Sequence, residues 1–265
     1  MDYQRTSLMG AQSLGRAILL LRLIARSGGA GATMAELAAS AELRRPTAHR
    51  MLKLLVAEGM LEQEQRTRRY RMGPLVFELG LLAPSPTPLI SACRSTLKRI
   101  AAETEDTVYL TLRSGIDGVC IDRVEASHAI RALTIDIGGR RPLGVGATGI
   151  ALLAALPPDE AEAALMRNSA DFKRYGRLTE QNVRENMEEA RQSGFGYSVE
   201  RITQGVSGIG IAIPNANGTP FVGISIASIT ARIVGDRQAF LEALLHREAA
   251  TLATQLSHAF PLRTA

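Results

Sequence analysis

The sequence predicts an α+β protein of two domains, in which a small helical domain precedes a larger one built on an antiparallel sheet with flanking helices. The chain has 265 residues, which is enough for two separate cores. Three prolines fall within residues 83–88, "APSPTP", and indicate a stiff linker between expected domains at 1–82 and 89–265. Helical periodicity dominates before this linker, whereas pairs of alternating strands mixed with helices follow it.

The excess of positive charge is confined to the first domain. Residues 1–82 hold twelve Lys and Arg against seven Asp and Glu, a balance of +5, while residues 83–265 hold nineteen of each. A local basic patch on an otherwise neutral chain is typical of a domain that binds a polyanion, and a solvated basic face is the alternative.

Three helices are expected before residue 60. Residues 12–26 have helical periodicity, with an expected core stripe of Leu14, Ala17, Ile18, Leu21 and Ile24. Thr33 and Glu36 predict a capping box at the start of a short second helix. Pro46 suits the first turn of a third helix, which Gly59 ends.

A two-stranded hairpin is expected at residues 60–73, around an arginine-rich turn, followed by a short apolar helix at 74–82 that we expect to contact a second copy. Three helices followed by a basic hairpin describe a winged helix-turn-helix, whose third helix enters the major groove of DNA. Side chains at the start of that helix reach base edges, and hairpin arginines contact phosphate or the minor groove. The expected DNA-binding residues are Arg44, Arg45, Thr47, Ala48, His49 and Arg50 on the helix and Arg66, Arg68 and Arg69 on the hairpin.

The second domain should contain both helices and strands. The expected helices are 90–104, 150–156, 158–168, 179–193 and 236–260. The expected strands are 107–113, 119–125, 208–214 and 221–228, with a further extended run at 130–136.

Residues 144–149, "GVGATG", match the dinucleotide-binding spacing G-x-G-x-x-G. That motif needs a buried strand before it and a second parallel strand after it, and neither is expected here. We therefore interpret it as a close-packed loop and helix start, whose amides at Ala147 and Thr148 can face an anionic ligand. Arg140 and Arg141 just before it could bind a ligand carboxylate or form a solvated pair.

Other chemistry is not indicated. No apolar run approaches the roughly 20 residues that span a bilayer, and the N-terminus lacks the features of a signal peptide, so we expect a soluble, cytoplasmic protein. Cys93 and Cys120 are expected to be free thiols, and the histidines lack metal-ligand spacing. We expect no cofactor, no metal and no catalytic residues.

Segments in both halves resemble the IclR family of bacterial transcriptional regulators. "SLGRAILLLRLIAR", "MAELAASAELRRPTAHRMLKLLVAEGMLE" and "YRMGPLVFELG" are similar to its DNA-binding domain, and "LKRIAAETEDTVYL", "DRVEA", "GGRRPLGVGATGIALLAALP", "RQSGFGYSVE" and "FVGISIAS" to its effector-binding domain. The resemblance implies a GAF-like or profilin-like second domain that binds a small carboxylate or aromatic metabolite, and a homodimer or tetramer that represses or activates at operator DNA. The pocket residues that it implies are Leu133, Leu143, Ala147, Thr148, Glu200, Val206, Gly208 and Ser225.

The chain departs from the family pattern at Gly144, Ile150 and Gly208, where histidine, lysine and cysteine are frequent, and at Arg44 and Pro46. A ligand-responsive regulator is nevertheless the leading hypothesis. The alternatives are a metabolic enzyme with an accessory DNA-binding domain and a nonspecific architectural DNA protein.

Overall fold

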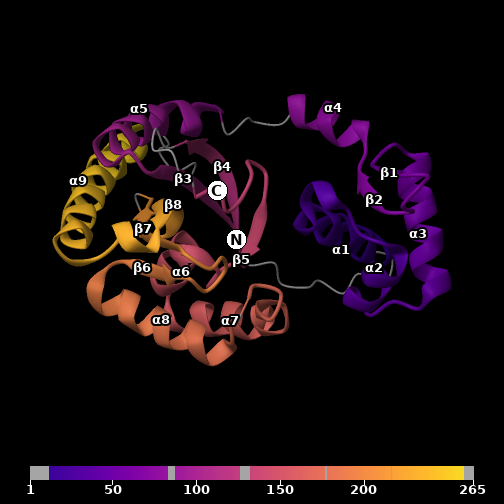
Figure 1. Cartoon of the computed structure of the whole chain (residues 1–265). Coiled ribbons are helices and arrows are strands. Elements are labelled where there is room, and N and C mark those ends of the chain that lie inside the picture. The colour runs from indigo at the N-terminus through magenta and orange to yellow at the C-terminus, as the bar shows by residue number, and fades with distance from the viewer. Residues whose placement is uncertain (1–11, 83–86, 126–131, 177, 216, 260–265) are drawn as a thin grey trace. The chain divides into compact units, whose positions relative to one another are not determined.

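The computed structural model describes residues 12–82, 87–125, 132–176, 178–215 and 217–259 (Figure 1). The chain divides into two compact units, Met1–Ser85 and Pro86–Ala265. Of the expected linker, residues 83–86 lie outside the described residues. Thr87 and Pro88 belong instead to the first turn of a helix, where proline is tolerated because its missing amide hydrogen would have no intrahelical partner.

The first unit consists of three helices, a two-stranded hairpin and a fourth short helix after the hairpin, as predicted. Its elements are α1 (Gln12–Arg26), a short 3-10 turn (Gly28–Ala30), α2 (Met34–Ser40), α3 (Arg45–Ala57), β1 (Leu61–Gln63), β2 (Tyr70–Met72) and α4 (Pro74–Leu82). The strands are antiparallel and pair Leu61 with Met72. An isolated bridge between Ala32 and Tyr70 joins the hairpin to the entry of α2.

Local signals set the helix ends of this unit. The Thr33 hydroxyl accepts a hydrogen bond from the Glu36 amide at 3.3 Å, and the Glu36 carboxylate accepts one from the Thr33 amide at 2.8 Å, which confirms the capping box. Pro46 lies in the first turn of α3. Gly59 adopts φ +70° just after that helix, a conformation that a residue with a side chain rarely takes.

The core of the first unit differs from the expected stripe of α1. Leu20 and Ile24 are fully buried, whereas Leu14 is 63% and Ile18 is 42% exposed. The residues of α1 that pack on the core all lie in its second half, against α2, α3 and β2. Periodicity identified the helix, but it could not show that only half of its length is covered within this unit.

The second unit is a six-stranded sheet in the order β5-β4-β3-β8-β7-β6, antiparallel throughout. Its strands are β3 (Thr107–Ser114), β4 (Asp117–Val124), β5 (Arg140–Pro142), β6 (Gly196–Val199), β7 (Val206–Pro214) and β8 (Pro220–Ile229). Its helices are α5 (Thr87–Thr104), α6 (Gly146–Ala154), α7 (Pro158–Phe172), α8 (Glu180–Ser193) and α9 (Gly235–Ala259), with a 3-10 turn at Thr230–Arg232. The predicted α+β fold class is therefore confirmed.

Two edge strands were misjudged from the sequence. Residues 132–136 of the expected extended run form no strand, and residues 130 and 131 lie outside the described residues. The outer strand on that side is β5, which pairs with β4. At the other edge β6 was missed, because its four residues follow a helix directly and begin with glycine.

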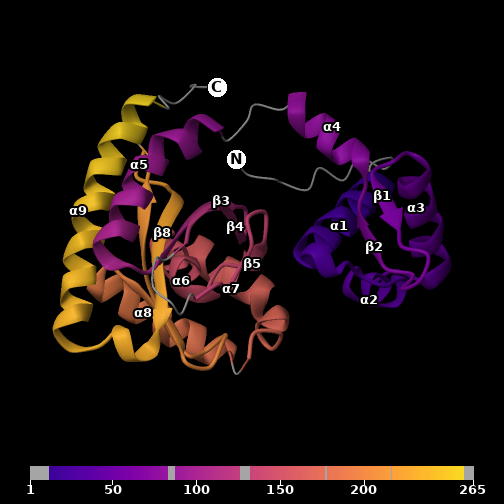
Figure 2. The same ribbon diagram turned by 45° about the horizontal axis from the view of Figure 1, so that its top comes forward.

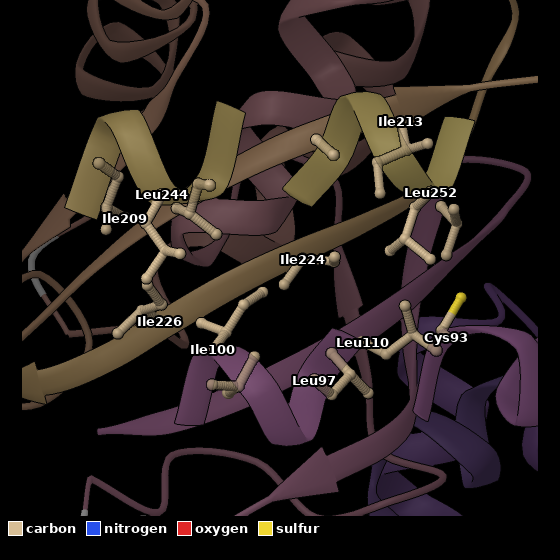
Figure 3. Close-up of a cluster of buried hydrophobic side chains, with 14 of the residues drawn as sticks. Cys93, Leu97, Ile100, Leu110, Ile209, Ile213, Ile224, Ile226, Leu244 and Leu252 are labelled. Atoms are coloured by element: carbon tan, nitrogen blue, oxygen red, sulfur yellow. The ribbon is translucent and has the colours of Figure 1, made fainter. Parts of the chain in front are cut away.

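Helices cover the two faces of the sheet differently (Figures 1 and 2). On one face, α5 and α9 contribute apolar side chains that meet those of β3, β7 and β8. Figure 3 shows this layer, with Leu97 and Ile100 of α5 and Leu244 and Leu252 of α9 directed towards the strands. On the other face, α6 lies against β6, β7 and β8 and is itself packed on α8.

Candidate DNA interface and ligand pocket

The start of α3 exposes most of the side chains expected to contact DNA. Arg44, Arg45, His49 and Arg50 are exposed, and Thr47 is half-buried. Among the described residues, the side chains of these three arginines form no hydrogen bond or ion pair. Ala48 is an exception to the expectation, because it is fully buried and packs into the core instead of facing outwards.

One further cation lies on the same surface and was not singled out from the sequence. Lys53 is exposed in α3 and follows His49 by four residues. Residues at this spacing are neighbours on one helix face, so the spacing itself was the available signal.

The hairpin turn separates its arginines into two pairs. Arg66 and Arg68 are exposed and have no side-chain partner among the described residues. Arg69, in contrast, donates a hydrogen bond from Nη1 to the carbonyl oxygen of Gly31 at 2.8 Å and lies 3.4 Å from Glu36 Oε2. Arg71 lies 3.4 Å from the Glu64 carboxylate. Two arginines at the tip thus remain open to a partner, and two at the base hold the hairpin in place.

A pocket opens in the second unit between the first turn of α6 and the face of the sheet opposite α5 and α9. Its walls come from all six strands of the sheet and from the segments 134–135 and 202–203. The cavity has a volume of about 80 Å³.

The structure brings five of the eight expected pocket residues together and places three elsewhere. Ala147, Thr148, Val206, Gly208 and Ser225 line the pocket. Leu133 is 50% exposed, and Leu143 is fully buried in the core around α6, α7 and α8. Glu200 is exposed in a turn after β6, at φ +49°. Each of these three residues is close in sequence to a residue that lines the pocket, but its own side chain does not line it.

The orientation of Ser225 was open in the sequence, and the structure decides it. Its neighbours Ile224 and Ile226 belong to the core beneath α5 and α9. Because strand side chains alternate, Ser225 faces the opposite side and lines the pocket. It lies between Tyr109 of β3 and Gly210 of β7.

Glycines allow the start of α6 to lie directly on the sheet. A Cβ at Gly196 would lie 2.2 Å from the carbonyl oxygen of Ala147, and one at Gly210 would lie 2.8 Å from the amide nitrogen of Thr148. The "GVGATG" segment is therefore a close-packed helix start. A dinucleotide site is excluded here because the sheet is antiparallel and provides no parallel strand pair.

The family departure at Gly144 has a steric reason. Gly144 adopts φ +93°, and a Cβ there would lie 2.5 Å from Cγ1 of Val183. A histidine could be accommodated only if the packing of α8 changed.

The two arginines before α6 have separate surroundings. Arg140 donates from Nη2 to the Ser114 hydroxyl at 2.9 Å and lies 3.4 Å from the Asp117 carboxylate. Arg141 lines the pocket and donates a hydrogen bond to the carbonyl oxygen of Thr134. Burial lowers the pKa of Arg141 from its usual value, because a guanidinium loses hydration inside the protein.

Other pocket residues were also missed from the sequence. The Tyr109 hydroxyl donates to the carbonyl oxygen of Ala132 at 2.7 Å and accepts from the Thr134 amide at 3.0 Å, which fixes one wall. Cys120 lines the pocket, and burial raises the pKa of its thiol to about 11. Each of these residues lies in a predicted strand. The sequence, however, gave no signal that showed which face of the sheet would contain the pocket.

Two negative findings apply to the described residues. No helix there is both long enough and apolar enough to cross a bilayer. No three His, Cys, Asp or Glu side chains in the described parts of the chain gather into a set that could hold a metal ion.

Family comparisons match both units. The model of the bacterial transcriptional regulator IclR C-terminal domain matches residues 83–254, and that of the IclR helix-turn-helix domain matches residues 13–65. The chain belongs to the IclR family. It is therefore a transcriptional regulator with DNA-binding and effector-binding domains, and the enzyme alternative is set aside.

Individual IclR relatives are similar over most of their length. The transcriptional repressor IclR of Escherichia coli K12 is 28% identical over 229 residues, covering 85% of this chain and 83% of the relative. The repressor AllR of Salmonella typhimurium LT2 is 27% identical over 235 residues, covering 88% of this chain and 85% of that protein.

Solved IclR structures share the fold. A regulator from Silicibacter sp. TM1040 has a TM-score of 0.75 at 21% identity, covering 92% of this chain and 96% of that one. An IclR homologue from Microbacterium hydrocarbonoxydans, solved as a complex with 4-hydroxybenzoate, has a TM-score of 0.64 at 21% identity, covering 93% of this chain and 99% of the homologue.

Proposed function

We propose that this chain is a repressor that holds operator DNA through α3 and the β1–β2 hairpin and releases it when a small organic molecule, a carboxylate or an aromatic compound, occupies the pocket beside α6. The observation that carries the proposal is the set of arginines at the start of α3 and at the hairpin tip, which are exposed and have no acidic partner among the described residues. Two curated relatives named as repressors support the direction of control.

Each group of DNA-facing side chains has a separate role in this proposal. Thr47, His49 and Arg50 contact base edges in the major groove. Arg44 and Arg45 contact phosphates near the start of the helix, and Arg66 and Arg68 contact phosphate or the minor groove. Arg69 steadies the hairpin through its contacts with Gly31 and with Glu36 of α2 and leaves its remaining donors for phosphate.

Ligand control requires that the effector bind one state of the protein better than another. The ligand would contact the amides of Ala147 and Thr148 and the side chains of Val206 and Ser225, with Gly208 providing space. Coupling to DNA would pass through the linker and the assembly of subunits.

A second copy of the chain is the proposed partner of two apolar helix surfaces. Phe77, Leu81 and Leu82 of α4 are 71%, 68% and 87% exposed, and Leu14 and Ile18 of α1 are also uncovered. Such a patch favours a homodimer, or a tetramer of two dimers, that reads a palindromic operator in the cytoplasm.

Competition binding tests the proposal. The purified protein is mixed with a labelled fragment from upstream of its own gene, and unlabelled random DNA is added at increasing salt. We expect retention of the specific fragment and a steep loss of affinity with salt. Equal competition by random DNA would favour an architectural protein, and salt-insensitive binding would contradict the proposed interface.

A further inference from the structure

A half-buried positive charge, that of Arg141, lies in the ligand pocket without an acidic partner among the described residues. Arg141 is part of the pocket wall, and none of the described residues that line this pocket is Asp or Glu. The hydrogen bond of its guanidinium goes to a neutral oxygen, the carbonyl of Thr134. Burial of a charged group is costly unless an opposite charge or several hydrogen bonds compensate it.

The neighbouring arginine shows what a purely structural role looks like in this fold. Arg140 lies on the same strand, and its guanidinium contacts the buried Asp117 carboxylate and the Ser114 hydroxyl. Its charge is therefore balanced within the protein. The charge of Arg141 is not.

A second source of positive potential lies at the same end of the pocket. A Cβ placed on Gly146, the first residue of α6, would lie 3.7 Å from Nη1 of Arg141. The first amides of a helix have no intrahelical partner and favour an anion. The guanidinium and these amides can therefore bind the same acidic group.

We propose that Arg141 determines ligand specificity in this pocket by selecting molecules with a carboxylate over neutral molecules of the same shape. The inference rests on the proposed function only in taking this pocket as the effector site. A guanidinium has five N–H donors in a planar fork, so Arg141 can retain its bond to Thr134 and still bind a carboxylate through two others. The rest of the ligand would extend towards Cys120 and Ser225.

The first test needs no ligand. Arg141→Leu removes the uncompensated charge, so the melting temperature of the unliganded full-length protein should stay the same or rise. Arg140→Leu is a matched loss of one charge on the same strand. It leaves the buried Asp117 carboxylate without this partner, so it should lower the melting temperature. If Arg141→Leu lowers the melting temperature as much as Arg140→Leu does, Arg141 is a structural residue and the inference is wrong.

The second test measures selectivity with matched acid and amide probes: 4-hydroxybenzoate with 4-hydroxybenzamide, pyruvate with pyruvamide, and lactate with lactamide. Titration calorimetry on the wild-type protein should show that at least one acid binds more tightly than its amide. Arg141→Leu should weaken the binding of that acid by about tenfold or more and leave the affinity for the amide almost unchanged. Arg141→Lys, which keeps the charge but loses the fork, should restore part of the preference.

Several outcomes would overturn the inference. They are an acid preference that persists in Arg141→Leu, tighter binding of the amides, no binding of any acid at millimolar concentration, and a preference for inorganic phosphate. These outcomes differ from failure of the proposed function. If an amide or another neutral compound binds and releases operator DNA, the regulator stands and only Arg141 selectivity fails.

Discussion

The two units use arginine in different ways. At the start of α3 and at the hairpin tip, arginines are exposed and have no acidic partner among the described residues. In the second unit, most described arginines contact a carboxylate, as Arg99 does with Glu248 and Arg232 and Arg237 do with Asp106. The charge balance is +5 for residues 1–82 and zero for residues 83–265.

This difference shows that the role of an arginine depends on where its counter-charge lies. In the second unit the counter-charge belongs to the protein, so arginine links elements that are distant in sequence. For the arginines at the start of α3 and at the hairpin tip it must come from outside, which fits a polyanion such as DNA. Arg141 is an exception in the second unit, because it is half-buried and the described residues of the pocket wall hold no counter-charge for it.

The largest effect is expected where an internal counter-charge is removed. Asp106 is 3% exposed and accepts hydrogen bonds from Ser228 at 2.5 Å, Arg232 at 3.1 Å and Arg237 at 2.8 Å. Asp106→Ala should lower the free energy of unfolding by about 3–5 kcal/mol, because two arginines lose their partner. Urea denaturation measures it. Asp136→Ala is the control, since the side chain of Asp136 is 96% exposed, and an equal loss in both variants would contradict the comparison.

Removal of a base-reading arginine should affect DNA binding and leave folding unchanged. Arg50→Ala should weaken binding to the specific operator by roughly tenfold to a hundredfold, which is the effect of losing one good base contact. Fluorescence anisotropy measures the affinity, and thermal melting confirms the fold. The exposed Arg167 of α7 provides a control of equal charge change, and an equal loss of affinity in Arg167→Ala would show that only net charge matters.

The hairpin arginines should separate into two classes. Arg66→Ala should weaken binding to all DNA sequences alike. It should also reduce the slope of log affinity against log salt concentration by about one. Its melting temperature should not change. Arg69→Ala should also lower the melting temperature, because it removes the contacts with Gly31 and Glu36. The division fails if both variants have the same stability.

The smallest effect concerns pH. Burial raises the pKa of the Cys93 thiol from 9.0 to about 11. The unfolded chain releases this proton at lower pH than the folded protein does, so the contribution to stability is complete below pH 9 and is lost as pH rises towards 11. The melting temperature of the wild-type protein should therefore fall more steeply between pH 9 and 11 than that of Cys93→Ala. Parallel slopes would show that this thiol does not contribute.

Much of the architecture could be predicted because its signals are local. The capping box of Thr33 and Glu36, the proline in the first turn of α3 and the strand pairs depend on residues close together in the chain. The basic residues at the start of α3 could be identified for the same reason. Ala48 was misjudged because its burial depends on the packing of α3 against distant elements.

The pocket was only partly predictable. Glycines that permit close packing are visible in the sequence, and Ala147 and Thr148 were found through them. The resemblance to the family implies, by motif position, that Leu133, Leu143 and Glu200 also line the pocket, yet none of the three does so.

The sequence by itself determined the order of helices and strands, the location of the basic surface and membership of a regulator family. Only the tertiary structure decided that Arg140 contacts Asp117 while the adjacent Arg141 lines the pocket, and that Ser225 faces it. The physical reason is that neighbouring strand residues point to opposite faces of a sheet. What each one meets depends on register and packing between segments far apart in the chain.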